Sequence, residues 1–427
     1  MRKMKDSGIE WIGEIPEKWS IEKLKRNVKI EMGQSPSSDC YNNDNIGFPF
    51  LQGNADFTDR FPVERIYTTE ANKFSKVGDL LLSVRAPVGA INIADKEYAI
   101  GRGLCSITGG RISVPFLWYA MEILRQEFDA NSTGSTFESI NTEDVGNATI
   151  IVPSESEQSC IVDYLDKKCA EIDAIIAAKE KTNELLKERR QSIIYEAVTK
   201  GLDPTVPMKD SGVEWIGEIP ESWSVWRLKH LLCQEKGAIK AGPFGSSITA
   251  NDMQGGDVKV FTQRTVLDND FLSGDEYISF DKYEDLKGFS VKTGDILITT
   301  RGTIGKTAIV PKNSFGILHP CLIKMSIDSD KINKSLLCRI FNETNIFEEQ
   351  LRLASNATTI DVIYTQNLLN IFVPLAPLHE QDRICKYLNG KCESLDYLIS
   401  SNDSTIKKLK EYRQSVIYEA VTGKIEV

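Results

Sequence analysis

The sequence lacks several features that would place it in a class at once. No apolar run approaches the roughly 18 residues that span a bilayer, and the N-terminal stretch MRKMKDSGIEWIGEIP has no apolar signal-peptide segment. We therefore expect a cytoplasmic protein. Its nine cysteines form no CxxC pair and its three histidines are scattered, which argues against a disulfide framework and a metal site.

Motifs for catalysis are also missing. The stretch TRGTIGKTA (300–308) looks like a phosphate-binding loop, but Thr300 occupies the place of its first glycine. An apolar, strand-like AIVP follows where a helix should begin. We predict instead a strand, a turn that exposes Lys306, and a second strand. Without a methyltransferase motif of the NPPY or DPPF kind, or a convincing nuclease triad, we predict that the chain is not an enzyme and holds no cofactor or metal.

What the sequence does contain is an internal repeat. Residues 4–26 and 208–230, here called the leaders, are nearly identical at a spacing of 204 residues. A second repeat, at a spacing of 223, runs from Tyr164 and Tyr387 to Thr199 and Thr422. The order leader, variable segment and long segment therefore occurs twice, so we expect pseudo-two-fold symmetry. The C-terminus ends where a leader would begin, which predicts that the two chain ends lie close together in a quasi-circular arrangement.

The long segments have the pattern of paired helices. Between residues 152 and 200, apolar residues recur every three or four positions. Ser154 and Glu157 form a capping box, and Gly201 with Pro204 ends the segment. About 45 residues at about 1.5 Å each give a rod of about 65 Å, which needs an equally long partner. The apolar positions are Ile161, Leu165, Ile172, Ile176, Leu186, Ile193 and Ala197.

The variable segments match weakly. They share VGDLLLSVRAPVG (77–89) with TGDILITTRGTIG (293–305), and a Gly/Ser/Thr-rich loop at 131–140 and at 355–363. Short apolar runs between Gly, Asn and Pro predict globular α+β domains, with helices near 115–128 and 334–353. Tryptophans 11, 19, 215 and 223 are expected to anchor the leaders, or alternatively to form interface hot spots.

These observations predict an α+β chain with two globular domains and two long helices that pack against each other. Nearly identical leaders and helices should present two copies of one surface to two copies of one partner. The unlike variable segments should bind two different ligands of one kind. The predicted divisions are 1–151 and 204–372 for the domains with their leaders, and 152–203 and 373–427 for the helices.

The repeated motifs resemble those of the DNA-specificity subunit of type I restriction-modification systems, over essentially the whole chain. They are WIGEIPEKW and WIGEIPESW in the leaders, VPSESEQ and VPLAPLHEQDRI at the helix starts, and RQSIIYEAVTKG and RQSVIYEAVTGK at the helix ends. The resemblance implies two target-recognition domains, each reading one half of a bipartite, asymmetric site in double-stranded DNA. It also implies that the long coiled-coil helices form an antiparallel pair that separates the two domains, sets the spacer and docks two methyltransferase (modification) subunits.

Further partners are implied in the same way. A motor-nuclease (restriction) subunit joins that core, and S-adenosylmethionine, ATP and magnesium are expected in the partner subunits. The net charge of −10 counts against a nucleic-acid binder and favours a rival reading, a symmetric protein-interaction scaffold. A nucleotide-binding enzyme that uses Lys306 is a weaker third reading.

For DNA contact we select polar and basic residues near glycine-rich loops. Each could also be an ordinary surface or turn residue. Because both domains retain Arg85 and Arg301, these two could contact phosphate or form a structural ion pair under a turn. The stretch PFGSS (243–247) could offer backbone N–H groups to phosphate or be a tight turn. The selected residues are Gln52, Asn54, Arg85, Arg102 and Ser135 in the first domain and Gln263, Arg264, Arg301, Lys306 and Asn356 in the second.

A set of polar residues recurs at the ends of both long helices. They could form a methyltransferase dock that is used twice, or they could bridge the two helices. The set is Arg190, Gln191, Tyr195 and Glu196 with Arg413, Gln414, Tyr418 and Glu419.

Overall fold

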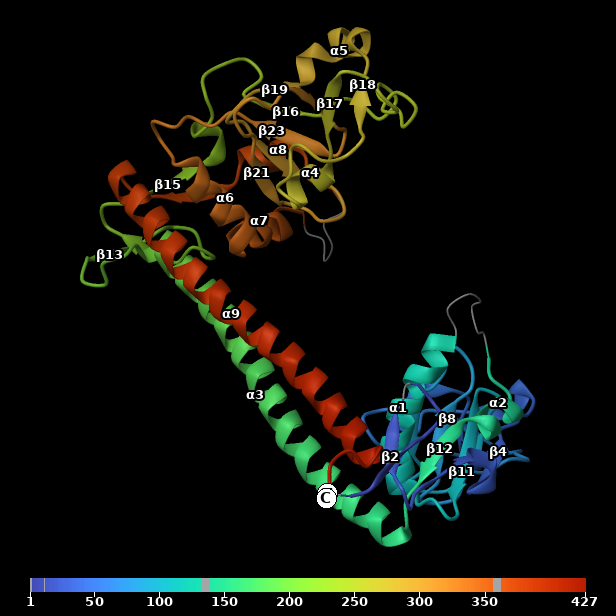
Figure 1. Ribbon diagram of the computed structural model, residues 1–427. Coiled ribbons are helices and arrows are strands. Elements are labelled where there is room, and N and C mark those ends of the chain that lie inside the picture. Colours follow the sequence, from blue (N-terminus) through green and yellow to red (C-terminus); the bar gives the residue numbers. More distant parts are fainter. Residues whose placement is uncertain (1, 11, 132–138, 356–361) are drawn as a thin grey trace. The chain divides into compact units, whose positions relative to one another are not determined.

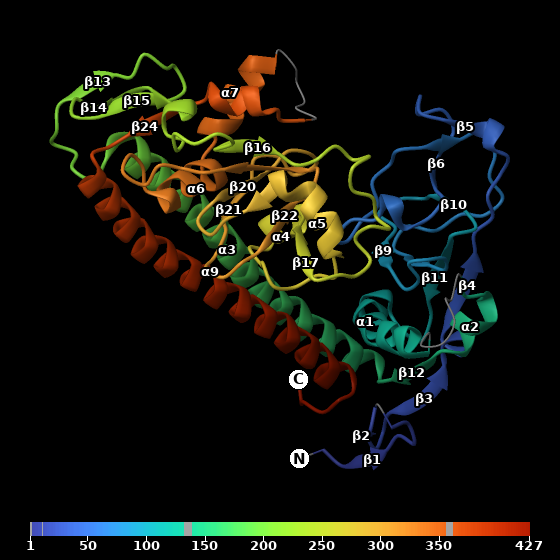
Figure 2. The ribbon, with the colours of Figure 1, turned by 90° about the horizontal axis from the view of Figure 1, so that it is seen from above.

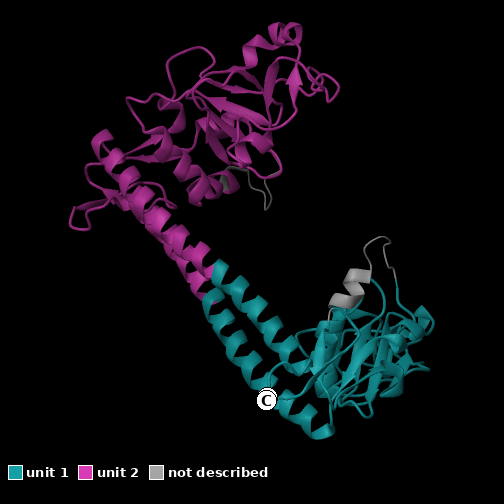
Figure 3. Cartoon of the chain, viewed as in Figure 1, with its two compact units in different colours: residues 1–180, 403–427 teal, residues 181–402 magenta. Residues whose placement is uncertain are grey.

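The computed structural model describes residues 2–10, 12–131, 139–355 and 362–427. The chain forms two compact units: unit 1 comprises residues 1–180 and 403–427, and unit 2 comprises residues 181–402 (Figure 3). Each unit contains one leader, one globular domain and part of both long helices (Figure 1). The sequence repeat is therefore a repeat of structure, and the predicted α+β class is confirmed.

Each leader folds into an antiparallel hairpin, and its next strand pairs with the strand that leads into a long helix. This pairing joins the two ends of each variable segment, so the segment can diverge between them without altering the frame. In unit 1 the strands are β1 (Met4–Asp6), β2 (Glu14–Pro16), β3 (Ser20–Lys23) and β12 (Thr149–Val152). In unit 2 they are β13 (Met208–Asp210), β14 (Glu218–Pro220), β15 (Ser224–Arg227) and β24 (Phe372–Leu375).

Each globular domain contains two four-stranded sheets (Figure 2). The first sheet is antiparallel and has the same strand order in both units. In unit 1 this order is β4 (Val28–Met32), β11 (Leu104–Gly109), β8 (Leu80–Ser83) and β9 (Ile91–Ile93). In unit 2 it is β16 (Ile239–Ala241), β23 (Leu322–Met325), β20 (Ile296–Thr299) and β21 (Thr307–Ile309).

The second sheets share one parallel pair, β6 with β10 and β17 with β22. In the matching registers Leu51 lies opposite Ile100, and Phe261 lies opposite Leu318. In unit 1 the strand order is β10 (Ala99–Ile100), β6 (Phe48–Leu51), β7 (Tyr67–Thr68) and β5 (Tyr41–Asn42). In unit 2 it is β18 (Tyr277–Ile278), β17 (Val258–Phe261), β22 (Gly316–Leu318) and β19 (Ser290–Val291).

The Gly-Asp step of the shared block closes the turn into the central strand of the antiparallel sheet. Asp79 accepts hydrogen bonds from Lys76 N (2.8 Å) and Ser106 Oγ (2.5 Å). Asp295 accepts from Lys292 N (2.9 Å) and Ser326 Oγ (2.6 Å). Both aspartates are buried, so the Gly-Asp step of each block serves the folding of the sheet.

Helices cover the sheets and differ between the units. Unit 1 contains α1 (Val114–Asn131) and α2 (Thr142–Asn147). The helices predicted near 115–128 and 334–353 are confirmed, but the second region contains two helices, because Thr344 has extended backbone angles and separates them. The Thr344 hydroxyl donates to Ile340 O (2.6 Å), and this bond satisfies one of the carbonyl groups left without a partner at the end of α6. The helices of unit 2 are α4 (Gln263–Leu267), α5 (Phe280–Leu286), α6 (Lys334–Glu343), α7 (Ile346–Ser355) and α8 (Thr365–Leu369).

The long helices are α3 (Glu155–Lys200) and α9 (Leu378–Val421), of 46 and 44 residues (Figure 1). They are antiparallel. Arg413 pairs with Asp173 in unit 1 and Arg190 pairs with Asp396 in unit 2, so partner numbers fall along α9 as they rise along α3. The apolar stripe is confirmed, since Ile161, Leu165, Ile172, Ile176 and Ala197 are buried.

One stripe position is polar. Asn183 is 6 % exposed, and its Oδ1 accepts a hydrogen bond from Asn402 Nδ2 (3.0 Å). A polar pair in an apolar seam disfavours other registers of the helices.

The helix ends agree with the sequence patterns. Gly201 and Gly423 adopt φ of 78° and 72° after α3 and α9, a conformation that favours glycine. At the start of α3 the Glu157 carboxylate accepts from Ser154 N (3.1 Å), which is one half of the predicted capping box. The Ser154 hydroxyl donates to that same carboxylate (2.6 Å).

Both chain ends lie in unit 1, as predicted. Arg2 forms an ion pair with Glu157 at the start of α3. Val427 and Arg2 line the same small hollow, and Gly423 lies against Pro16 and Trp19 of the leader. The end of α9 thus meets the first leader without a covalent link, whereas the end of α3 continues into the second leader.

The leader tryptophans anchor the leaders. Trp19 and Trp223 are almost fully buried in cores that include the ends of α9 and α3, respectively. Trp223 Nε1 also donates to Glu380 Oε2 (3.0 Å). Trp215 is half-buried against the same core, and Trp11 lies outside the described residues.

Within the described ranges, no helix has the length and apolar character of a membrane span. Nor do the described residues contain a cluster of His, Cys, Asp or Glu suited to a metal ion.

Candidate nucleic-acid interface

In unit 1 the ends of several strands form a continuous hydrogen-bonded row, here called the first rim (residues 51–54, 84–85, 101–103 and 139–140). Gly103 N donates to Gln52 O (3.2 Å), and Val84 N donates to Gly103 O (2.9 Å). Ile140 N then donates to Val84 O (2.9 Å). The row brings together Gln52, Arg85 and Arg102, which are far apart in the sequence, and all three side chains are exposed.

The Gly-Arg-Gly sequence of the first rim has a steric reason. A Cβ on Gly103 would lie 2.5 Å from Gln52 O, and one on Gly101 would lie 3.0 Å from Gln52 Cα. Only glycine permits the two backbones to approach so closely. Arg102 is held between these glycines by a hydrogen bond from its backbone N to Ser35 Oγ (3.1 Å).

A polar hollow of about 400 Å³ opens beside this row. Gln52 and Arg102 line it together with Ser35 and Tyr41. Amide and guanidinium groups are the groups that read adenine and guanine by paired hydrogen bonds. Asn54, in the turn of residues 54–56, is half-buried and is not among the lining residues.

Arg85 belongs to the turn that follows β8. Ser83 Oγ donates to Arg85 O (2.9 Å) and Pro87 O (3.0 Å), which fixes the turn. Among the described residues, the Arg85 side chain has no ion-pair partner, and the same is true of Arg301 in unit 2. Both arginines are exposed, so the structural ion pair considered from the sequence is absent in this part of the chain.

Unit 2 repeats the row as the second rim (residues 261–264, 300–303, 319–322 and 362–363). His319 N donates to Phe261 O (3.0 Å), Thr300 N to Cys321 O (3.0 Å), and Ile363 N to Thr300 O (3.0 Å). His319 and Pro320 stand where unit 1 has Gly101 and Arg102. Burial lowers the pKa of His319, against an opposing effect of Glu276, and its Nδ1 accepts from Cys321 N (3.2 Å).

The predicted contact residues of unit 2 lie in and beside the second rim. Gln263 is the first residue of α4 and lies near Gly302, the residue after Arg301. Arg264 is exposed and forms an ion pair with Asp268 (3.2 Å) in the next turn. Thr307 follows the turn between β20 and β21, and it is hydrogen-bonded to Asn342 of α6.

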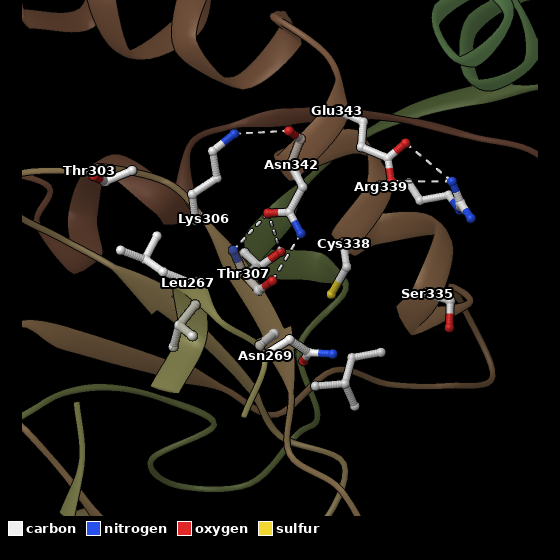
Figure 4. A pocket seen from close by; sticks show the side chains of 13 residues that line it. Leu267, Asn269, Thr303, Lys306, Thr307, Ser335, Cys338, Arg339, Asn342 and Glu343 are labelled. Atoms are coloured by element: carbon white, nitrogen blue, oxygen red, sulfur yellow. Dashed lines mark hydrogen bonds and ion pairs between the residues drawn. The ribbon is translucent and has the colours of Figure 1, made fainter. Parts of the chain in front are cut away.

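The prediction that Lys306 is exposed is wrong. It is half-buried, and its Nζ donates to Asn342 O (2.9 Å) (Figure 4). Asn342 also accepts from Thr307 N (2.7 Å) and donates to Thr307 O (2.9 Å), so α6 is joined to β21 at this point. The predicted strand–turn–strand itself is confirmed by β20 and β21. A hollow of about 610 Å³ lies between β21, α4 and α6.

The described residues at the ends of the two Gly/Ser/Thr-rich stretches belong to the rims. Ser139 pairs with Arg85 in an isolated bridge, and Val362 pairs with Arg301 in the same way. Ser135 and Asn356, two of the selected residues, lie outside the described residues.

The repeated arginines of the long helices have equivalent surroundings. Arg413 contacts Glu122 of α1 (3.0 Å) and Asp173 of α3 (3.1 Å). Arg190 contacts Glu343 of α6 (3.2 Å) and Asp396 of α9 (3.1 Å). Burial opposes the charge of Arg413, but the nearby carboxylates outweigh it and raise its pKa. Each arginine thus joins a domain helix to both long helices.

The other repeated helix residues divide into two groups. Tyr195 and Tyr418 donate to the leader carbonyls Trp215 O (3.1 Å) and Ile12 O (3.0 Å). Gln191 and Gln414 are exposed. Glu196 is exposed and Glu419 is half-buried, and they accept from Ser192 (3.1 Å) and Ser415 (3.0 Å), respectively.

A hollow of about 720 Å³ in unit 2 is lined by residues from both the predicted DNA-contact set and the predicted partner-contact set. It is lined by Lys306, selected for DNA, and by Arg190, Gln191 and Tyr195, selected for a partner.

The loops after β4 and β16 were not fully recognised from the sequence. Both begin with a tightly packed glycine: a Cβ on Gly33 would lie 2.2 Å from Gly101 O, and one on Gly242 would lie 2.2 Å from His319 O. The loops therefore belong to the two rims. The signal was present as a shared G-x-x-x-S-S pattern, in GQSPSS (33–38) and GPFGSS (242–247).

Comparison with known proteins agrees with this architecture. The family model described as "Type I restriction modification DNA specificity domain" matches residues 16–187 and 220–411. The putative type I restriction enzyme MjaX specificity subunit of Methanocaldococcus jannaschii is 36 % identical over 192 residues, which are 44 % of each chain. The MjaVIII specificity subunit of the same organism is 23 % identical over 443 residues, covering 97 % of this chain and 94 % of that one.

Solved structures have the same fold. A chain described under "Structural basis underlying complex assembly and conformational transition of the type I R-M system" gives a TM-score of 0.72 at 17 % identity, covering 96 % of this chain and 99 % of that one. The HsdS subunit from Thermoanaerobacter tengcongensis gives 0.51 at 18 % identity, covering 96 % and 98 %. Because the family model matches both halves of the repeat, the chain belongs to the family of type I restriction-modification DNA specificity subunits, which are non-catalytic.

Proposed function

We propose that each unit reads one half of a bipartite, asymmetric site in double-stranded DNA. The observation that carries the proposal is the pair of rims, which share one backbone frame and differ in side chains. The first rim presents Gln52 and Arg102 where the second has Thr262 and Pro320. Equal frames with unlike side chains suit two readers of one kind of ligand with different sequences.

The exposed arginines of the rims supply local positive charge, although the chain carries a net charge of −10. Arg85, Arg102 and Arg301 are exposed and have no ion-pair partner among the described residues, whereas the exposed Arg264 is paired with Asp268. Phosphate contacts need only a local basic face, and they position a reader without specifying bases. In this proposal Arg85 and Arg301, at equivalent places in unlike rims, contact phosphate, while Gln52, Asn54 and Gln263 contact bases.

The paired helices set the distance between the half-sites and dock two methyltransferase subunits. The exposed Gln191 and Gln414 recur on equivalent surfaces, so one partner surface can be used twice. Motor-nuclease subunits join this complex. The partners hold S-adenosylmethionine, ATP and magnesium and perform the chemistry.

Exchange of one domain tests the proposal. Residues 27–151 are replaced by the corresponding segment of another specificity subunit, and the modified DNA is sequenced for methylated adenine. We expect one half-site to change and the other half-site to remain. A change of both half-sites contradicts the two-reader proposal. A complex that binds no duplex at any salt concentration instead favours the protein-interaction scaffold.

A further inference from the structure

An aromatic side chain projects from the second rim. Phe244 is 85 % exposed, in the loop of residues 242–247 that follows β16. A phenylalanine left in water contributes no burial free energy, so the position is not explained by the stability of the domain. The loop contains both proline and glycine, and its turn is closed by a hydrogen bond from Ser247 N to Phe244 O (2.8 Å).

The base of this loop is fixed to the second rim. Gly242 N donates to Leu322 O (2.8 Å), and a Cβ on Gly242 would lie 2.2 Å from His319 O. The neighbouring Cys321 O accepts from Thr300 N (3.0 Å), one residue before Arg301. Phe244 therefore projects from the same rim as Arg301, and not from a remote surface.

The equivalent loop of unit 1 is polar. Gly33 N donates to Leu104 O (2.9 Å), and a Cβ on Gly33 would lie 2.2 Å from Gly101 O, which matches the packing of Gly242. Counting from these glycines, Ser35 occupies the position of Phe244. Ser35 lines the hollow with Gln52 and Arg102. The same place in the frame thus holds a hydroxyl in one unit and an aromatic ring in the other.

The loop also presents backbone donors beside Phe244. The N–H groups of residues 244, 245 and 246 have no hydrogen-bond partner within the described residues. Successive free N–H groups in a turn form a concave site for an anion.

We propose that Phe244 reads the half-site of unit 2 by apolar contact with a thymine 5-methyl group. This rests on the proposed function. Phenylalanine has no hydrogen-bonding group, and the thymine methyl is the apolar group that a base edge presents in the major groove. Phe244 is accordingly a specificity-determining residue of unit 2, and its counterpart Ser35 reads by hydrogen bonding.

Replacing thymine by uracil removes only this methyl group and so tests the contact. The complex with methyltransferase subunits is first used to define the site, and exchange of residues 231–372 shows which half-site unit 2 reads. Each thymine of that half-site is then replaced by uracil on either strand. Binding to each duplex is measured for the wild type, Phe244→Ala and Phe315→Ala. Phe315 is the matched control, because it is 52 % exposed and precedes β22 at the end opposite His319.

We expect uracil at one position to weaken binding of the wild type and of Phe315→Ala by about fourfold, the ratio equivalent to about 0.8 kcal/mol for one methylene-sized group. Phe244→Ala should bind thymine and uracil duplexes equally. The proposal is overturned if Phe244→Ala keeps the uracil effect, or weakens every duplex to the same extent. It is also overturned if the substitution leaves DNA binding intact and releases the methyltransferase subunits, which would indicate a protein contact.

These results separate the two proposals. A wild-type complex that binds its duplex while Phe244→Ala behaves as the wild type refutes only the thymine contact. A wild-type complex that binds no duplex refutes the proposed function, and the thymine contact with it.

Discussion

The buried pair of Asp295 and Lys324 allows a quantitative prediction for Asp295→Asn. The two side chains are 5 % and 9 % exposed, and Asp295 Oδ2 lies 3.9 Å from Lys324 Nζ. Removing one partner of a buried ion pair costs about 3–5 kcal/mol. Lys324 also donates to Ser290 O (2.6 Å), a bond that the substitution leaves. Together with the long separation, this places the expected loss of unfolding free energy at about 2–3 kcal/mol.

Unit 1 provides the matched control. Asp79 occupies the position of Asp295, but the residue that stands at the position of Lys324 is Ser106. Asp79→Asn therefore removes no ion pair, and we expect it to cost about 1–2 kcal/mol through weakened hydrogen bonds.

The effect of Asp295→Asn should also depend on pH. Burial lowers the pKa of Lys324 below 10.5, and the charge of Asp295 partly offsets this. Without Asp295 the pKa of Lys324 falls further in the folded state. Between the folded and unfolded pKa values the unfolded chain binds more protons, so stability rises with pH in that window. The loss caused by Asp295→Asn should hence be largest near pH 7 and smaller near pH 10.

Urea denaturation of the full chain, followed by circular dichroism at both pH values, measures these losses. Each variant is compared with the wild type at the same pH. Equal losses for Asp295→Asn and Asp79→Asn, or a loss for Asp295→Asn that grows toward pH 10, would refute the reasoning.

Three further predictions concern single substitutions. Gly423→Ala should lower the unfolding free energy by at least about 2 kcal/mol, since its Cβ would lie 2.5 Å from Pro16. The control is Gly217→Ala, which has a similar φ but open space around it and should lower the unfolding free energy by about 1 kcal/mol. Arg413→Met should lower the unfolding free energy measured by thermal denaturation by about 1–2 kcal/mol, because two partly exposed ion pairs are lost. An unchanged midpoint of thermal unfolding would contradict the conclusion that Arg413 joins α1 to the long helices. Gln52→Ala should reduce the discrimination at one base of the first half-site by about 1–3 kcal/mol in competition binding. An altered base preference in the second half-site would contradict the proposed contact of Gln52.

The frame of the fold was predictable because it is repeated. Nearly identical leaders, the spacing of Ile172 and Ile176, and Gly201 after the helix all report local geometry that one sequence can reveal.

The rims were predictable only in part, because they depend on long-range packing. Arg85 and Arg301 were found through the repeated turn, but nothing local showed that Lys306 would reach Asn342 O. The exposure of Phe244 depends on how Gly242 packs against His319, and the sequence alone does not report that distance. The interruption at Thr344 was missed because the apolar period continues across it.

Sequencing of methylated adenine tests the central claim most directly. The DNA of a host that carries this chain with active methyltransferase subunits is compared with the DNA of the same host without the chain. We predict the loss of one bipartite, asymmetric methylation motif. Exchange of residues 27–151 should then alter one half-site only, and exchange of residues 231–372 should alter only the other half-site. An unchanged set of motifs, or a palindromic motif with two equal halves, would contradict the account.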